Sequence, residues 1–190
     1  MKNLFFTFLA LVSLDHLFAQ NHSGSEISIG VEGGLPLSTL KETHKFGFGG
    51  TVKYACNLDE TIALTLQSGY IVYPGKSFKS IYYPNSSQAP YSEKMSFPNL
   101  RQIPLKAGAR FSFGNIYLEP QLGVSFTSTP QKSYTEFDIN KTSNTAFTYA
   151  GNIGIFATKE IDISARYEGF KMNDRNVSII GLRVGYNFSF

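Results

Sequence analysis

The chain has a single cysteine, no tryptophan and, beyond its first twenty residues, no apolar run that approaches the ~20 residues a membrane-spanning helix requires. Because Cys56 has no second cysteine to pair with, a disulfide scaffold within one chain is excluded. Charged residues make up only 16% of the sequence, below the roughly 25% typical of soluble globular domains. The net charge of +3 is too small to indicate a nucleic-acid partner.

Aromatic and small residues are abundant instead. The 190 residues include 17 Phe, 11 Tyr and 17 Gly. So many large apolar groups exclude intrinsic disorder. The composition is typical of a β protein that buries a large apolar surface, against either lipid or protein.

The N-terminus predicts the compartment. Lys2 precedes an apolar run at 4–12, and the segment ends at Phe18-Ala19-Gln20. A basic start, a short apolar stretch and a small final residue are typical of a cleaved secretory signal peptide. We therefore expect a signal at 1–19 and a single domain at 20–190. The alternative is a membrane anchor, for which the run is too short.

The remaining chain alternates between apolar and polar residues over eight segments. Strict alternation favours strands over helices, and segments of about ten residues suit tilted strands that cross a bilayer. The predicted strands cover 27–35, 46–56, 62–72, 103–113, 116–126, 147–157, 161–167 and 180–190.

Charged residues fall on one face of these strands. Arg101 is the one charge with the apolar parity, at a strand start. The other parity carries five basic and four acidic residues: Glu32, Lys53, Lys106, Arg110, Glu119, Asp162, Arg166, Glu168 and Arg183.

The connections alternate in length. Long segments at 36–45, 74–99 and 127–145 and a moderate one at 171–176 alternate with short turns at 57–60, 114–115 and 158–160. Long loops at one end and short turns at the other are typical of membrane barrels, whose apolar side chains face lipid and whose polar side chains face the lumen. The sequence thus predicts an all-β fold: an eight-stranded, antiparallel, up-and-down transmembrane β-barrel. Alternation alone also allows a soluble barrel in which the apolar side chains face the interior and the charged side chains face water.

The last strand carries a second membrane signal. Tyr186, Phe188 and Phe190 lie in phase at the C-terminus, as in bacterial outer-membrane barrels whose insertion machinery reads this strand. We therefore expect contacts with outer-membrane lipid and with that machinery.

Several motifs carry a family resemblance. Phe18-Ala19-Gln20, the segments 101–106 (RQIPLK) and 117–123 (YLEPQLG), and the final Phe190 resemble the small outer-membrane β-barrel domain family common in Bacteroidetes, similar to PorT and the OmpX-like barrels. The resemblance covers nearly the whole mature chain. It implies fold and outer-membrane location, and no catalytic residues.

Enzymatic chemistry has little support. The histidines are His16, His22 and His44, and none lies in a predicted strand. An outer-membrane enzyme would need His44 with a loop serine or Asp138. Neither a zinc spacing nor a phosphate-binding glycine loop is present, so no metal or cofactor is expected.

The nine charged lumen residues favour a structural network of ion pairs, because eight strands enclose a space that side chains fill. A conducting path and a small-ligand site are the alternatives. Arg110 and Glu119 flank the turn at 114–115, so we expect them to pair across that hairpin.

The sequence therefore predicts a monomeric, non-enzymatic outer-membrane protein with a structural, adhesive or assembly role and no nucleic-acid partner. A surface partner is expected at 74–99, a loop rich in Ser, Tyr and Pro. A soluble lipocalin-like carrier of an apolar ligand and a loop-centred outer-membrane enzyme are the two alternatives.

Overall fold

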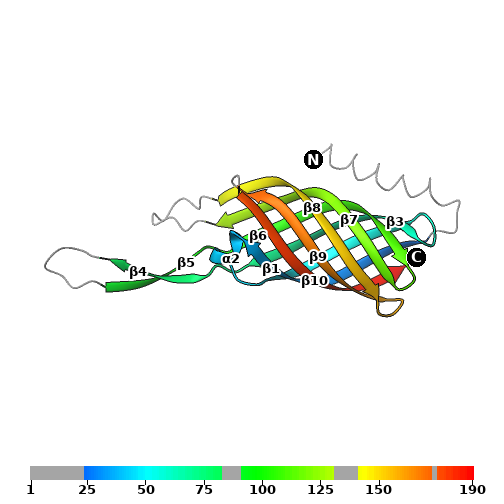
Figure 1. Cartoon of the computed structure of the whole chain (residues 1–190), viewed down its shortest axis with the longest axis horizontal. Coiled ribbons are helices and arrows are strands. Elements are labelled where there is room, and N and C mark those ends of the chain that lie inside the picture. Colours follow the sequence, from blue (N-terminus) through cyan, green and yellow to red (C-terminus); the bar gives the residue numbers. More distant parts are fainter. Residues whose placement is uncertain (1–23, 83–90, 131–140, 173–174) are drawn as a thin grey trace.

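Eight strands close into one antiparallel barrel, in the order β1-β10-β9-β8-β7-β6-β3-β2 (Figure 1). The computed structural model describes residues 24–82, 91–130, 141–172 and 175–190; the predicted signal peptide lies outside them. The barrel strands are β1 (Ser25–Ser38), β2 (Gly47–Asn57), β3 (Ile62–Tyr73), β6 (Leu100–Phe113), β7 (Ile116–Pro130), β8 (Lys141–Phe156), β9 (Ile161–Met172) and β10 (Arg175–Ser189). The predicted up-and-down, eight-stranded barrel is confirmed.

Closure joins the first barrel strand to the last. β1 pairs with β10 along its whole length, from Glu26 opposite Ser189 to Ser38 opposite Val177. The two ends of the described chain therefore meet, and the Ser25 N–H donates to the Phe190 carbonyl at 3.1 Å. Because no edge is left at this junction, the backbone groups of the first and last strands are satisfied within the barrel.

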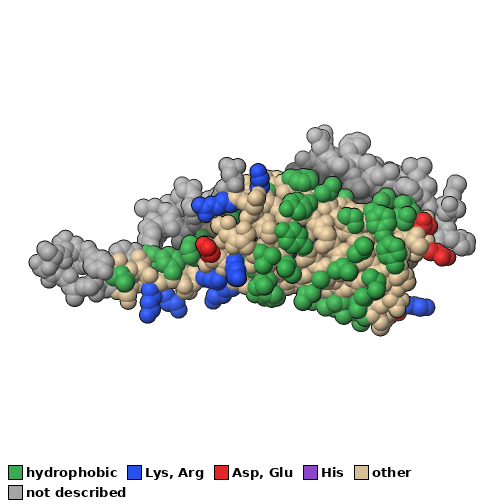
Figure 2. Space-filling model, in the orientation of Figure 1, with side chains coloured by type: hydrophobic (Ala, Val, Ile, Leu, Met, Phe, Trp, Pro, Cys, Tyr) green, Lys and Arg blue, Asp and Glu red, His purple; other side chains and the backbone are tan. Residues whose placement is uncertain are grey.

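The side chains of the apolar parity point outward. Val31 is 69% exposed, Leu122 59% and Leu182 63%, and Figure 2 shows apolar side chains spread over the visible barrel wall. Soluble monomers rarely expose contiguous apolar patches beyond a few hundred Å². The structure thus resolves the inside-out ambiguity of the sequence in favour of a wall that faces lipid.

Short turns close one end of the barrel, called here the turn end. At the β2–β3 turn, Asp59 Oδ1 accepts hydrogen bonds from the N–H and hydroxyl of Thr61 and from the Ile62 N–H, at 2.7–2.8 Å. These bonds, the Thr61 N–H first, hold the pKa of the Asp59 carboxyl below its usual value. The β6–β7 turn is two residues, with Gly114 at a φ of 65°, where a side chain would be strained.

The opposite end, the loop end, differs from the prediction in three places. The moderate loop expected at 171–176 is reduced to two residues, because β9 runs to Met172 and β10 begins at Arg175. The expected loop at 127–145 is shorter, because β7 runs to Pro130 and β8 begins at Lys141, with Thr129 opposite Thr142. The expected loop at 74–99 contains a hairpin of β4 (Ser77–Tyr82) and β5 (Tyr91–Ser96). Polar strand segments keep pairing beyond the apolar band, since their side chains accept water while the ladder satisfies the backbone.

The β4–β5 hairpin, called the arm below, projects away from the barrel (Figure 1). Its two strands pair only with each other in the described sheets. A four-residue helix, α2 (Leu40–Thr43), lies in the β1–β2 connection at the loop end. Among the described residues, no helix is both long and apolar enough to cross a membrane.

Candidate functional site

The barrel interior contains all nine charged residues that the parity singled out. Each is 5% exposed or less: Glu32, Lys53, Lys106, Arg110, Glu119, Asp162, Arg166, Glu168 and Arg183. A tenth, Glu26, joins them at the turn end of β1 with its side chain 12% exposed. Sequence reasoning missed Glu26 because the predicted strand began at 27, although Glu26 has the same parity as Glu32.

With Glu26 included, five basic and five acidic side chains pair off. The pairs are Arg110–Glu26, Lys53–Glu119, Arg183–Asp162, Lys106–Glu168 and Arg166–Glu32. Four of them join strands that are not neighbours in the barrel and so cross the lumen. Such pairs tie opposite walls together and fill the interior.

The pair of Arg183 and Asp162 is the most fully hydrogen-bonded of these five. Arg183 Nη1 donates to both oxygens of Asp162 at 2.9 Å, while its Nε and Nη2 reach Thr51 and Ser28 at 2.9 and 2.6 Å. Asp162 also accepts from the Tyr117 hydroxyl at 3.0 Å. Buried charges are tolerated when every donor and acceptor finds a partner in this way.

The expected ion pair between Arg110 and Glu119 is wrong. The hairpin register is the one expected, since Gly108 lies opposite Gln121 and Phe111 opposite Leu118. However, Arg110 Nη1 reaches Glu26 across the lumen at 2.5 Å, and Glu119 takes Lys53 at 2.8 Å. Parity and register identify which residues lie on the same part of the barrel wall. The long charged side chains, however, form ion pairs with residues on the facing wall.

Toward the loop end the interior changes from charged to apolar. Residues at 0–4% exposure from five elements pack together there: Leu40, Ile71, Tyr73, Leu100, Phe170, Val177 and Ile179. This apolar cap was not predicted, because the lumen parity was expected to stay polar. The sequence signal is the continuous apolar run at 71–73, where both parities turn apolar.

The apolar cap seals the loop end of the lumen. Leu40 of α2 is 2% exposed and belongs to the cap. The Tyr73 ring covers the small Gly47, where an added Cβ would lie 2.3 Å from a ring carbon. The polar interior below is thus closed from this side, and an open conducting path has no support in the described residues.

His44 follows α2 and serves as a structural residue. It is 9% exposed; its Nδ1 lies 2.8 Å from Thr43 Oγ1, and its Nε2 donates to the Pro98 carbonyl at 3.2 Å. Burial lowers the pKa of His44, and the bond to Pro98 opposes that shift in part. Because both ring nitrogens of His44 already have hydrogen-bond partners, the histidine is not placed to activate a nucleophile. Asp138 lies outside the described residues.

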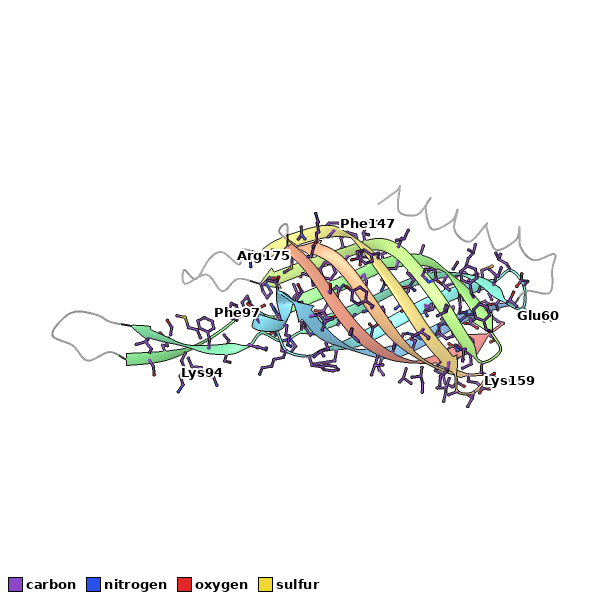
Figure 3. The ribbon with its side chains drawn as sticks, in the orientation of Figure 1. Glu60, Lys94, Phe97, Phe147, Lys159 and Arg175 are labelled. Carbon is purple, nitrogen blue, oxygen red and sulfur yellow. The ribbon has the colours of Figure 1, made fainter. Side chains whose placement is uncertain are left out.

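The arm presents two different faces. Phe78 lies opposite Met95 on one face, and the rings of Phe78 and Phe97 are 5.0 Å apart. On the other face Lys79 lies directly opposite Lys94, both exposed. Figure 3 labels Lys94 on the arm and Phe97 at its base. Like charges directly opposite each other destabilise a strand pair.

Exposed charge differs between the two ends of the barrel. The described residues of the loop end and arm carry Lys41, Lys45, Lys76, Lys79, Lys94, Arg101, Lys171 and Arg175 against Glu42 and Glu93. The turn end carries Asp59, Glu60, Lys159 and Glu160, of which Figure 3 labels Glu60 and Lys159. Basic side chains gather at the loop end and along the arm in Figure 2. No described residues form a cluster that could hold a metal ion.

Comparison with known proteins agrees with this architecture. The family model described as "Outer membrane protein beta-barrel domain" matches residues 4–188. No protein with a curated description matches the sequence significantly.

Solved structures share the fold at low identity. Ail of Yersinia pestis, the attachment invasion locus protein, in complex with the heparin analogue sucrose octasulfate, is 18% identical with a TM-score of 0.60, covering 88% of this chain and 100% of Ail. The N-terminal barrel of Pseudomonas aeruginosa OprF is 14% identical, with a TM-score of 0.55 and coverage of 88% and 100%. Neisserial surface protein A is 15% identical, with a TM-score of 0.54 and coverage of 87% and 97%.

Proposed function

Because this chain belongs to the family of outer-membrane protein β-barrel domains and lies in the outer membrane, we propose that it is a non-enzymatic adhesion protein that binds polyanionic partners at its loop end. The soluble lipocalin-like alternative is excluded by that location. In the proposal the loop end faces the cell exterior, as the long loops of such barrels do.

The single observation that carries the proposal is the pair of opposed lysines on a projecting arm. Lys79 and Lys94 face each other across β4 and β5 without a described acidic neighbour between them on that face, where the flanking residues are Ser77, Ile81, Ser92 and Ser96. An anionic group that binds between the two ammonium groups relieves their repulsion. The arm is thus a better anion receptor than two isolated surface lysines.

Further basic residues extend this surface toward the barrel. Lys41, Lys45 and Lys76 lie at the base of the arm, where Lys76 Nζ donates to the Lys41 carbonyl at 2.5 Å. A row of cations from the arm to the barrel rim suits an extended partner with repeated negative charges, such as a sulfated glycan. That Ail was solved with a heparin analogue, at a shared fold, is consistent with this chemistry.

The sealed lumen favours adhesion over transport or catalysis. Ion pairs fill the middle of the barrel and the apolar cap closes its loop end. His44, the histidine that an enzyme would need, is held by Thr43 and Pro98. The barrel is then a rigid mount that holds the arm above the membrane.

Three further expectations remain part of the proposal. We propose that Tyr186, Phe188 and Phe190 act as the insertion signal of the last strand, where they are 48%, 50% and 71% exposed. We also propose that the chain acts as a monomer. Within the family, it is proposed to fall in the PorT-like and OmpX-like branch of Bacteroidetes.

The test measures sucrose octasulfate and heparin binding to the folded barrel in lipid nanodiscs. Neutralising both arm lysines, Lys79→Gln with Lys94→Gln, is expected to weaken binding about tenfold, since two exposed charge pairs contribute about 0.5–1 kcal/mol each. The matched control, Lys79→Arg with Lys94→Arg, keeps the charge and should keep the affinity. Raising the salt concentration should weaken binding of the wild type and of this control alike. Equal affinity of the neutral and wild-type proteins would contradict the proposal.

A further inference from the structure

The barrel wall opens at one place near the loop end. Pairing between β8 and β9 stops at Thr148 opposite Phe170. Yet β8 continues with β7 as far as Lys141, and β9 continues with β10 as far as Met172. The stretch 141–147 of β8 therefore has one edge without a strand partner, and a seam separates it from β9.

One side chain bridges this seam. Asn144 Nδ2 donates to the Lys171 carbonyl at 3.3 Å, in place of a backbone ladder. If the register continued, Phe147 would lie opposite Lys171, because the preceding pairs place Tyr149 opposite Gly169 and Thr148 opposite Phe170.

A groove of about 780 Å³ lies over the seam. This volume falls within the ~300–1,000 Å³ of small-molecule sites. Its outer part is lined by Phe147, Tyr149 and Tyr167, which are 46–64% exposed and belong to the wall that faces lipid. Its deep part reaches Phe170 and Val177, which are members of the apolar cap.

A glycine shapes the aromatic outer part of the groove. Gly169 faces outward on β9, and the Tyr149 ring lies across it, since an added Cβ would be 2.4 Å from a ring carbon. The neighbouring Tyr167 is held by a hydrogen bond from its hydroxyl to Ser178 Oγ at 3.1 Å. Two fixed rings thus form an apolar surface directly below the polar rim of the groove.

The rim carries one charge. Lys171 is the only charged side chain in the lining, every residue of which is described, and it is exposed. Arg175, also exposed, lines an adjoining pocket of about 380 Å³ that shares Val177 with the groove. Figure 3 labels Phe147 and Arg175 toward the loop end of the barrel.

We propose that this groove is a binding site for a single anionic lipid of the outer membrane. The acyl chain lies against Phe147, Tyr149 and Tyr167 and covers the seam, while the negatively charged headgroup binds Lys171. Three observations point to lipid: the groove continues the lipid-facing wall, it runs from apolar to basic in the direction from membrane to water, and it carries no carboxylate. The site is separate from the arm and does not rest on the adhesion proposed above.

The absence of tryptophan from the sequence makes a direct test possible. Phe147→Trp introduces a unique fluorophore at the groove. Leu105→Trp is the comparison reporter on the closed part of the wall, two strands away in the same ladder, where Leu105 lies opposite Val124 and Val124 opposite Phe147. Leu105 is 44% exposed in a region where β6 pairs on both sides.

Both reporters are placed in vesicles of phosphatidylcholine and phosphatidylglycerol in which one lipid at a time has brominated, quenching acyl chains. At position 147 we expect phosphatidylglycerol to associate about fivefold more strongly than phosphatidylcholine, as one lysine near an anionic lipid surface provides. At position 105 the two lipids should quench equally. Lys171→Glu should abolish the preference at 147, whereas Arg101→Glu, at an exposed residue of the closed wall, should leave it unchanged.

Each contrary result overturns the proposal. Equal preference at positions 147 and 105, or a preference at 147 that survives Lys171→Glu, shows that no specific lipid binds. Cross-links between copies of Thr145→Cys that form equally in every lipid mixture show that a second chain occupies the groove instead. Heat-dependent gel mobility verifies that each variant is folded, and Lys171→Gln replaces Lys171→Glu if the latter does not assemble, with the same loss of preference expected.

Discussion

The hydroxyl groups of Tyr73 and Tyr117 show how differently polar atoms are treated at two depths of one lumen. Both side chains are fully buried. The Tyr117 hydroxyl donates to Asp162 at 3.0 Å, in the charged middle of the barrel. The Tyr73 hydroxyl has no hydrogen-bond partner among the described residues, within the apolar cap. A buried hydroxyl without a partner loses its hydration and gains nothing in return.

The two tyrosines therefore predict opposite effects of one substitution. Tyr117→Phe removes one of the hydrogen bonds that the buried Asp162 carboxylate accepts and should lower the free energy of unfolding by about 1–3 kcal/mol. Tyr73→Phe should change it by less than about 1 kcal/mol, or raise it. Urea unfolding in lipid vesicles measures both. Equal losses in the two variants would show that water reaches Tyr73 and that the apolar cap is not sealed.

The lumen ion pairs predict a specific coupling. Glu119→Ala leaves Lys53 buried without its partner and should lower the free energy of unfolding by about 3–5 kcal/mol. The double variant Glu119→Ala with Lys53→Ala should be less destabilised than the sum of the single variants. The same cycle with Arg110, which pairs with Glu26 instead, should be closer to additive. Stronger coupling of Glu119 to Arg110 than to Lys53 would contradict the observed pairing.

Among the secondary-structure elements, α2 is short and depends on its surroundings. Four residues do not form a stable helix in water. Leu40 anchors it in the apolar cap, and His44 links it to Pro98 at the base of the arm. The Lys76 N–H donates to the Thr43 carbonyl at 2.8 Å, a second link to the arm. The apolar cap, α2 and the base of the arm are therefore one connected unit.

This unit should be sensitive to pH. Burial holds the pKa of His44 below its ordinary value of about 6.5, so the folded unit binds fewer protons than the opened one. The stabilisation by neutral His44 is complete above that value and is lost as the pH falls through the lower folded pKa. Once the intrinsic pH dependence of amide exchange is divided out, the protection factors of the His44 and Lys76 amides should fall in this range. In His44→Gln these protection factors should not change over the same range, and an equal fall there would assign the effect to another group.

At the scale of the whole molecule, the exposed apolar wall determines where the chain can be stable. Leu122 lies in the middle of β7 and is 59% exposed, while Leu58 is 41% exposed in the β2–β3 turn. Both leucine side chains are exposed on the outside of the protein, but they lie at different depths within a bilayer. An outward charge is costly at the centre of the membrane and tolerated near its surface.

Leu122→Arg should therefore make folding into vesicles less favourable by about 2–4 kcal/mol. Leu58→Arg should make it less favourable by only about 0–1 kcal/mol. Folding into liposomes, followed by the mobility shift of unboiled protein on gels, gives both values. Similar losses in the two variants would contradict the placement of β7 across the bilayer.

The sequence by itself determined which side chains share a face, because the pleat of a strand alternates strictly and a one-residue shift would turn every side chain over. Hence all eight strands, three of the four longer connections and nine of the ten lumen charges follow from the sequence pattern alone. Glu26 required only one more step along β1.

Only the tertiary structure decided how distant residues meet. The stagger of the closed barrel sets which long side chain reaches which partner across the lumen, so Arg110 binds Glu26 and not the Glu119 of its own hairpin. The apolar cap, the arm and the seam between β8 and β9 have the same origin. Each depends on where strand pairing stops, which is settled by packing among elements far apart in the chain and leaves no period in the sequence.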